Sequence, residues 1–380
     1  MLFSMATANE KLNVEGNNDE PAVPDVPKDL LLIIFIHGFK GTDSTFGSFP
    51  SRLEHILTET MDNVTVECIV FPAYETKGEA AQTAAVERFV DWLTTLTVQK
   101  EVAHGGGAGA AKIVLCGHSM GGLLAADALC ALIKSRPDEG APLWSRVIGC
   151  IAFDTPYLGL HPFVFKNSAT RAAEAADTAR TVVSDVLWFM GKNRDSPQAK
   201  SNPSLPQIAP ATESESTSKS TGWARWAPSA YVVGGAIAAG AAAGAAYWRR
   251  EDITSGYNWA FGHMKYVGTL WDGEGMTKRL DNLMLAEKQG IIFKMFYVLL
   301  PPSLPSFPSP RTFVVLPSRS SPAFSNYIIS KNSVATDEIQ AHTGLFEPTT
   351  NDGYYELGLE TAKIICEAAA RSGMHSTVPT

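Results

Sequence analysis

Short apolar runs recur along the first 160 residues of the chain and predict its innermost strands. The runs lie at residues 30–36, 112–116 and 147–153, and a β-branched run at residues 63–71 ends before Pro72. A strand that is buried on both faces is apolar at nearly every position rather than at alternate positions. We therefore predict four strands, and we expect the strand at residues 30–36 to be buried on both faces of a sheet.

Helical spacing of apolar residues appears between these runs. Residues 78–96 and 122–134 carry such spacing, and residues 104–111 form a glycine-rich connection. Strands that alternate with helices predict an α/β fold with a mainly parallel, doubly wound sheet. Further strands are expected at residues 293–300 and 312–316, on either side of a loop with five prolines, before a last helix at residues 357–372. In such a sheet, functional residues gather at the carboxyl ends of the strands.

The pattern breaks in the middle of the chain, which predicts a division into five parts. We expect a disordered arm at residues 1–28, core segments at residues 29–165 and 272–372, an insertion at residues 166–271 and a tail at residues 373–380. Within the insertion, residues 191–221 are rich in Ser, Pro, Thr and Lys, which is typical of a mobile loop. A large helical insertion at this place is expected to act like a lid.

An uncharged stretch of 21 residues runs from Ala227 to Tyr247 inside the insertion. Tryptophan and arginine flank both of its ends, and Gly240 and Gly244 form a GxxxG pair. Length, flanks and small residues favour a membrane-associated helix. The many alanines and glycines favour instead a helix that packs against the domain or forms part of the lid, and the sequence leaves both interpretations open.

Composition narrows the function classes. The chain has 380 residues and is 45% hydrophobic, with a net charge of −8 and no basic cluster, so nucleic-acid binding is not expected. Five cysteines without CxxC spacing argue against a disulfide framework or a zinc site, and we expect no metal and no cofactor. The first residues lack the pattern of a signal peptide. The sequence predicts an intracellular protein, cytoplasmic or on an internal membrane, that is not secreted.

The most informative motif is Gly117-His118-Ser119-Met120-Gly121. It stands between a predicted strand and a predicted helix. In a G-x-S-x-G turn of this kind, a nucleophilic serine projects from a crowded backbone, so the positions two before and two after it must lack side chains. The amino end of the following helix favours developing negative charge. The motif therefore predicts Ser119 as a nucleophile, with Gly117 and Gly121 as the glycines of its turn.

A second motif, His37-Gly38-Phe39, follows the first predicted strand. Together with Gly117–Gly122 it resembles the α/β-hydrolase superfamily and, within it, the serine esterases of the lipase group. The resemblance implies that the backbone N–H groups of Phe39 and Met120 bind an oxyanion. It also implies that His37 is structural and that the catalytic base follows the nucleophile in the chain.

The resemblance places the base in a late loop, which selects His342 over the other downstream histidines at positions 161, 263 and 375. The acid is more ambiguous, because the proline-rich loop at residues 301–310 contains no carboxylate. Asp154 directly follows the fourth strand and is favoured. Asp337 lies five residues before His342 and remains an alternative, with Asp272 and Asp352 behind it.

These residues predict a serine carboxylester hydrolase with a Ser119, His342 and Asp154 triad that works through an acyl-enzyme. An apolar insertion near the site favours lipid or other acyl esters as small-molecule substrates. The alternative is a non-catalytic protein that uses the same fold to bind a ligand or a partner, or that acts as a membrane-associated interaction protein.

Overall fold

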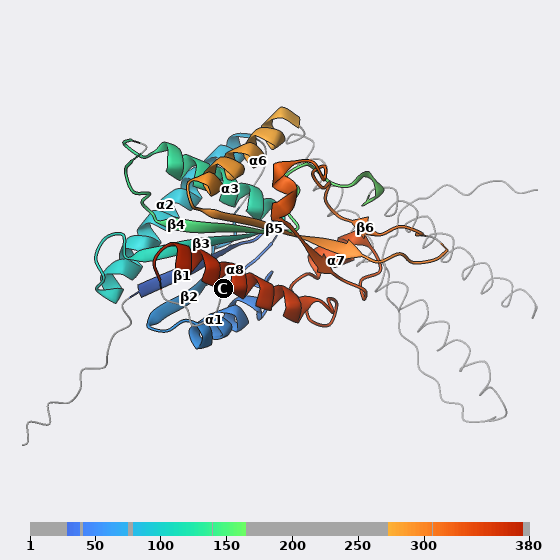
Figure 1. The fold of residues 1–380 in the computed structure, drawn as a ribbon, viewed down its shortest axis with the longest axis horizontal. Helices are drawn as coiled ribbons and strands as arrows, with labels where there is room; N and C mark the ends of the chain where they lie inside the picture. Colours follow the sequence, from blue (N-terminus) through green and yellow to red (C-terminus); the bar gives the residue numbers. More distant parts are fainter. Residues whose placement is uncertain are drawn as a thin grey trace, which may run out of the picture.

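The computed structural model describes residues 29–38, 41–74, 79–138, 140–164, 273–305 and 307–374. Seven strands in these ranges form one sheet with the order β2-β1-β3-β4-β5-β6, and β7 pairs with β5 (Figure 1). Every pairing is parallel except that of β5 with β6. The strands are β1 (Asp29–Ile36), β2 (Val64–Val70), β3 (Ala111–His118), β4 (Val147–Phe153), β5 (Ile292–Leu300), β6 (Arg311–Thr312) and β7 (Tyr327–Lys331). The predicted α/β fold with a mainly parallel sheet is confirmed.

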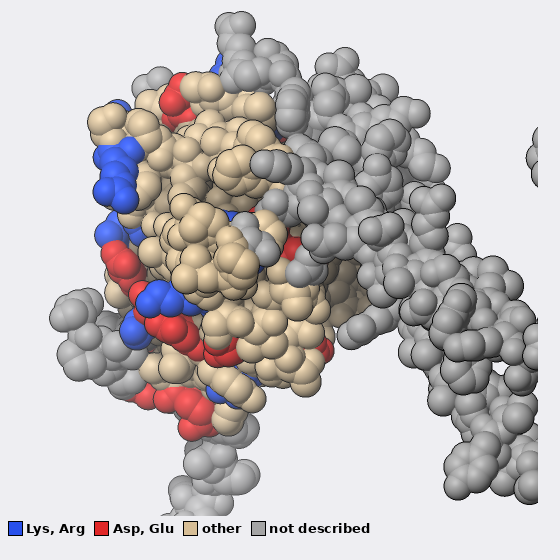
Figure 2. All heavy atoms as spheres, turned by 90° about the vertical axis from the view of Figure 1, so that its right-hand side faces the viewer, with Lys and Arg blue, Asp and Glu red and all other residues tan. Residues whose placement is uncertain are grey.

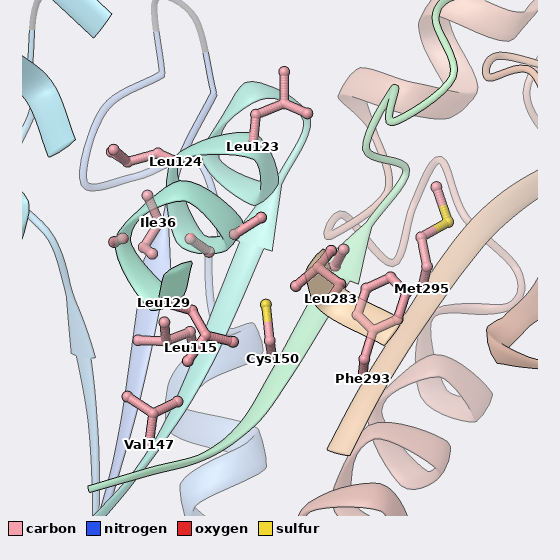
Figure 3. Packing of buried hydrophobic residues seen from close by; sticks show 14 of the residues in the cluster. Ile36, Leu115, Leu123, Leu124, Leu129, Val147, Cys150, Leu283, Phe293 and Met295 are labelled. Carbon is pink, nitrogen blue, oxygen red and sulfur yellow. The ribbon is translucent and has the colours of Figure 1, made fainter. Parts of the chain in front are cut away.

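The central strands owe their apolar sequences to burial on both faces. All residues of β3 and β4 are buried, and in β1 only Asp29 is partly exposed. Helices α2 (Glu79–His104), α3 (Met120–Lys134) and α6 (Gly273–Lys288) cover one face, while α1 (Phe49–Thr60) and α8 (Tyr354–Arg371) cover the other (Figure 1). Figure 3 shows how leucines of α3 pack over the side chains of β1, β3 and β4. These two layers hold the sheet rigid beneath the ends of its strands.

The second half of the core differs from the sequence prediction. Of the strand expected at residues 312–316, only the two residues of β6 pair with β5, and Val314 then forms an isolated bridge with Leu160. Phe313 and Val314 are buried, so their apolar character reflects packing rather than a strand ladder. The sequence also missed α1, α6, β7, the 3-10 helix at Pro322–Asn326 and the short helix α7 (Glu338–Thr343).

The predicted terminal arm at residues 1–28 and the insertion at residues 166–271 lie outside the described residues. The stretch between Ala227 and Tyr247 belongs to this part, so its packing or membrane role stays a prediction, as does the lid. Within the ranges that the structure describes, helices are too short or too polar to cross a membrane.

Candidate active site

Ser119 stands at the junction of β3 and α3, in the strand-turn-helix context that the sequence predicts. Its backbone has φ 56° and ψ −126°, a conformation that residues with a side chain rarely adopt. The N–H of Ser119 donates to the carbonyl oxygen of Phe153 at 2.9 Å, and the N–H of Gly122 donates to the carbonyl oxygen of Ser119 at 3.1 Å. These bonds hold a strained turn that presents one side chain at the carboxyl edge of the sheet.

The glycines around Ser119 are required by close backbone contacts. A Cβ atom on Gly117 would lie 2.5 Å from the backbone of Gly122, and one on Gly121 would lie 2.0 Å from the carbonyl oxygen of Ile36. Because the contacted atoms belong to the backbone, neither contact can relax without moving β1 or the start of α3 relative to the turn. The steric reason proposed from the sequence for both glycines therefore matches the packing of the turn.

The loop after β1 lies directly against the serine. A Cβ atom on Gly38 would lie 2.8 Å from the Cβ of Ser119. The ring of His37 stacks on Tyr74 with 5.2 Å between centroids, and its Nδ1 contacts the carbonyl oxygen of Gly38 at 3.1 Å. Phe39 lies outside the described residues, and Met120 is the first residue of α3. Of the two backbone groups predicted to bind an oxyanion, the N–H of Met120 therefore follows Ser119 directly, and that of Phe39 stays a prediction.

Asp154 and His342 meet in the interior, although 188 positions separate them. Nδ1 of His342 lies 2.6 Å from Oδ2 of Asp154, and both side chains are fully buried. Asp154 directly follows β4 with φ 47°, and its Oδ1 accepts a 3.1 Å hydrogen bond from the N–H of Val298 in β5. His342 lies in α7, after β7. The segments that follow β4 and β7, two strands that both pair with β5, therefore bring the favoured acid and the predicted base into contact.

Burial sets the charge state of this pair. It lowers the pKa of His342 and raises the pKa of Asp154, because each charged form loses its hydration. The N–H of Val298 acts in the opposite direction on the pKa of Asp154 and favours its carboxylate. A neutral imidazole whose Nδ1–H donates to the carboxylate keeps Nε2 as the nitrogen that accepts a proton.

The other predicted acids have different partners. Asp337 caps the amino end of α7, where its side chain accepts from the N–H of Gln340 at 2.7 Å. Asp352 accepts from the N–H of Ser333 at 2.8 Å and also from its hydroxyl. Asp272 lies outside the described residues. Of the described candidates, Asp154 is the carboxylate in contact with His342.

The ring of His161 has a different partner from the ring of His342. Nδ1 of His161 accepts from the N–H of Phe163 at 3.3 Å in the segment after β4. His263 and His375 lie outside the described residues.

The structure adds neighbours of His342 that the sequence did not identify. The ring of Phe313 stacks on the imidazole with 3.7 Å between centroids, and the ring of His118 lies 4.6 Å away. Arg311 of β6 pairs with Glu338 of α7 at 3.4 Å, and both side chains are buried. The sequence held a signal only for His118, which lies inside the G-x-S-x-G turn. The positions of Phe313 and Arg311 depend on a chain path that no local pattern reveals.

Comparisons with known proteins point to one family. Residues 33–254 match the family model described as the alpha/beta hydrolase family. None of the curated proteins matches the sequence. Among solved structures, phospholipase PlaB from Legionella pneumophila is 18% identical, with 34% of this chain and 26% of that chain covered and a TM-score of 0.26.

Two further solved structures are similar over a comparable part. A lipase-esterase related protein from Clostridium acetobutylicum is 19% identical, with 38% of this chain and 51% of that chain covered and a TM-score of 0.23. A cutinase-like protein from Cryptococcus sp. is 18% identical, with 36% and 57% covered and a TM-score of 0.22. The chain thus spans between about a quarter and just over half of the length of these proteins.

Proposed function

Because the chain belongs to the α/β-hydrolase family, we propose that it is a serine hydrolase that cleaves carboxylic esters. The observation that carries the proposal is the buried 2.6 Å contact between Nδ1 of His342 and Oδ2 of Asp154. Burial of an ionisable pair costs desolvation free energy. A catalytic role, in which the carboxylate orients the base, explains why such a pair is buried here. Ser119, on its strained turn, completes the set of residue types that acyl transfer requires.

The mechanism follows from the chemistry of each group. Nε2 of His342 accepts the proton of the Ser119 hydroxyl while Oγ attacks the ester carbonyl, and Asp154 stabilises the imidazolium that forms. The backbone N–H groups of Met120 and Phe39 donate to the oxyanion, where charge appears only in the transition state. His342 then protonates the departing alcohol. Water, deprotonated by the same imidazole, attacks the acyl-enzyme and releases the acid.

We assign acyl esters as the substrate class because the described surface near the strand ends is poor in charge. Figure 2 shows this side of the molecule, where the described atoms near the middle belong mainly to residues that are neither acidic nor basic. Phe163, which follows β4, is 53% exposed, and Leu304, which follows β5, is 79% exposed. A surface that is poor in charge and carries exposed apolar side chains favours a hydrocarbon chain over an ionic substrate.

A panel of p-nitrophenyl acetate, butyrate and octanoate tests both parts of the proposal. We expect hydrolysis by the wild type, with kcat/KM higher for the longer chains. The variant Ser119→Ala should lose at least about 1,000-fold in kcat, whereas the control Ser51→Ala, on the exposed side of α1, should match the wild type. Folded wild-type protein that hydrolyses none of these esters would favour the alternative, a non-catalytic binding protein. Equal kcat/KM for all chain lengths would contradict the expected preference for a hydrocarbon chain.

A further inference from the structure

His118 is the last residue of β3 and the immediate neighbour of Ser119, and its side chain contacts the helix that carries His342. Its Nε2 lies 3.1 Å from the carbonyl oxygen of His342, and it is 5% exposed. A carbonyl oxygen can only accept a hydrogen bond, so Nε2 of His118 carries the proton and donates it. One side chain thus joins the residue next to the nucleophile to the backbone of the base, 224 positions further along the chain.

The carbonyl group of His342 needs a partner from outside its own helix. Helix α7 is six residues long and ends at Thr343, one position after His342. The last four carbonyl groups of an α-helix have no partner within the helix, and a buried carbonyl without a partner costs free energy. His118 supplies the donor at this end, while Asp337 caps the other end through the N–H of Gln340.

The surroundings of His118 keep its ring neutral and fixed. The rings of Phe46 and Phe346 make T-shaped contacts with the ring of His118, with 6.5 Å and 5.3 Å between the ring centroids. Burial lowers the pKa of His118 to about 3, and the nearby His342 acts in the same direction. A neutral ring donates its hydrogen bond without opposing the positive charge that forms on His342 during the reaction.

We propose that His118 is a positioning residue, which holds α7 through the carbonyl group of His342 and so fixes the imidazole of His342 against Ser119 and Asp154. The proposal rests on the proposed function, in which His342 is the base. The residue directly before the serine of the G-x-S-x-G turn would thus align the base with the nucleophile. Loss of this bond shifts α7 and lengthens the proton-transfer distance, so it lowers kcat more than it raises KM.

Four variants test the assignment. His118→Leu removes the donor, and we expect kcat to fall by roughly 100-fold with KM within about twofold of the wild type. In His118→Gln, the amide nitrogen reaches about as far as Nε2, and most of the lost kcat should return. The side chain of His118→Asn is too short to reach the carbonyl oxygen, so its kcat should stay low. The comparison of the Gln and Asn variants therefore tests the role even if His118→Leu fails to fold. His55→Leu, at an exposed histidine of α1, is the matched control and should keep wild-type kinetics.

Hydrogen–deuterium exchange gives a readout that does not depend on activity. We expect the peptide at residues 338–346 to exchange faster in His118→Leu and His118→Asn than in the wild type, and His118→Gln to restore protection. Equal exchange in the four proteins, or equal kcat in the Gln and Asn variants, would overturn the positioning role. A wild type that hydrolyses no ester but shows the expected exchange pattern would instead contradict the proposed function and leave the contact between His118 and α7 supported.

Discussion

Replacement of Asp154 by Asn separates the two acids that the sequence left open. Asn tolerates the left-handed backbone at this position, where φ is 47°, so the substitution leaves the turn intact. Its side-chain oxygen can still accept the hydrogen bond from Val298. The change therefore acts mainly on the 2.6 Å contact with Nδ1 of His342.

The expected loss follows from the tautomer of the imidazole. In Asp154→Asn, the new side-chain amide donates its N–H to Nδ1 of His342, which makes that nitrogen the acceptor and moves the ring proton to Nε2. The base then cannot take the proton of Ser119. Loss of this orienting carboxylate lowers kcat by about 10,000-fold in a serine triad, which corresponds to about 5.5 kcal/mol of transition-state stabilisation.

Asp337→Asn is the matched control for this experiment. Its carboxylate caps α7 through the N–H of Gln340, and Asn is as good a cap as Asp, so kcat should stay within roughly threefold of the wild type. The assay is the hydrolysis of p-nitrophenyl butyrate, with thermal unfolding to show that both variants are folded. The reasoning is refuted if Asp154→Asn keeps more than roughly a tenth of the wild-type kcat, or if Asp337→Asn shows the larger loss.

Three further predictions follow from the packing and charge of the site. Gly121→Ala brings a Cβ to 2.0 Å from the carbonyl oxygen at the end of β1 and should destabilise the fold by about 3 kcal/mol or more. The control Gly149→Ala has no neighbour closer than 3.5 Å and should leave the stability unchanged. Similar urea unfolding midpoints for the two variants would contradict this prediction. Burial lowers the pKa of His342 and raises the pKa of Asp154 to about 7, so the carboxyl takes up the first proton as the pH falls. Because the mechanism needs Asp154 as a carboxylate, kcat/KM should fall as the pH drops through about 7; a profile that stays flat down to about pH 5 would be inconsistent with a buried acid. Arg311→Leu leaves the buried carboxylate of Glu338 without this partner and should cost about 3 kcal/mol in denaturant unfolding, so an unchanged midpoint would show that the ion pair adds nothing.

The strands in the middle of the sheet could be predicted because burial on both faces leaves an uninterrupted apolar run. This holds for β1, β3 and β4, whose predicted and observed bounds differ by at most two residues. The turn at Ser119 could be predicted for a related reason, since close backbone contacts at Gly117 and Gly121 exclude any side chain. In both cases, a strong steric or solvation demand acts on residues that lie close together in the sequence.

The part of the site around His342 could not be predicted in the same way. Strand β7 is five residues long and partly exposed, and α7 is only six residues long, so neither has a clear period. Asp337 and His342 both follow β7, so no strand separates them. The sequence analysis missed β7, and the choice between Asp154 and Asp337 stayed open. Phe313 was apolar because it packs on His342, and a local pattern cannot distinguish such packing from a strand.

The central claim is that Ser119 is a nucleophile activated by His342 and Asp154. A fluorophosphonate probe reacts covalently with such a serine, and mass spectrometry locates the adduct. The tryptic peptide at residues 113–134 contains a single serine, Ser119, which makes the assignment direct. We expect one adduct per folded molecule on this peptide, and its loss in Ser119→Ala. An adduct on another peptide, or no adduct on folded wild-type protein, would contradict it.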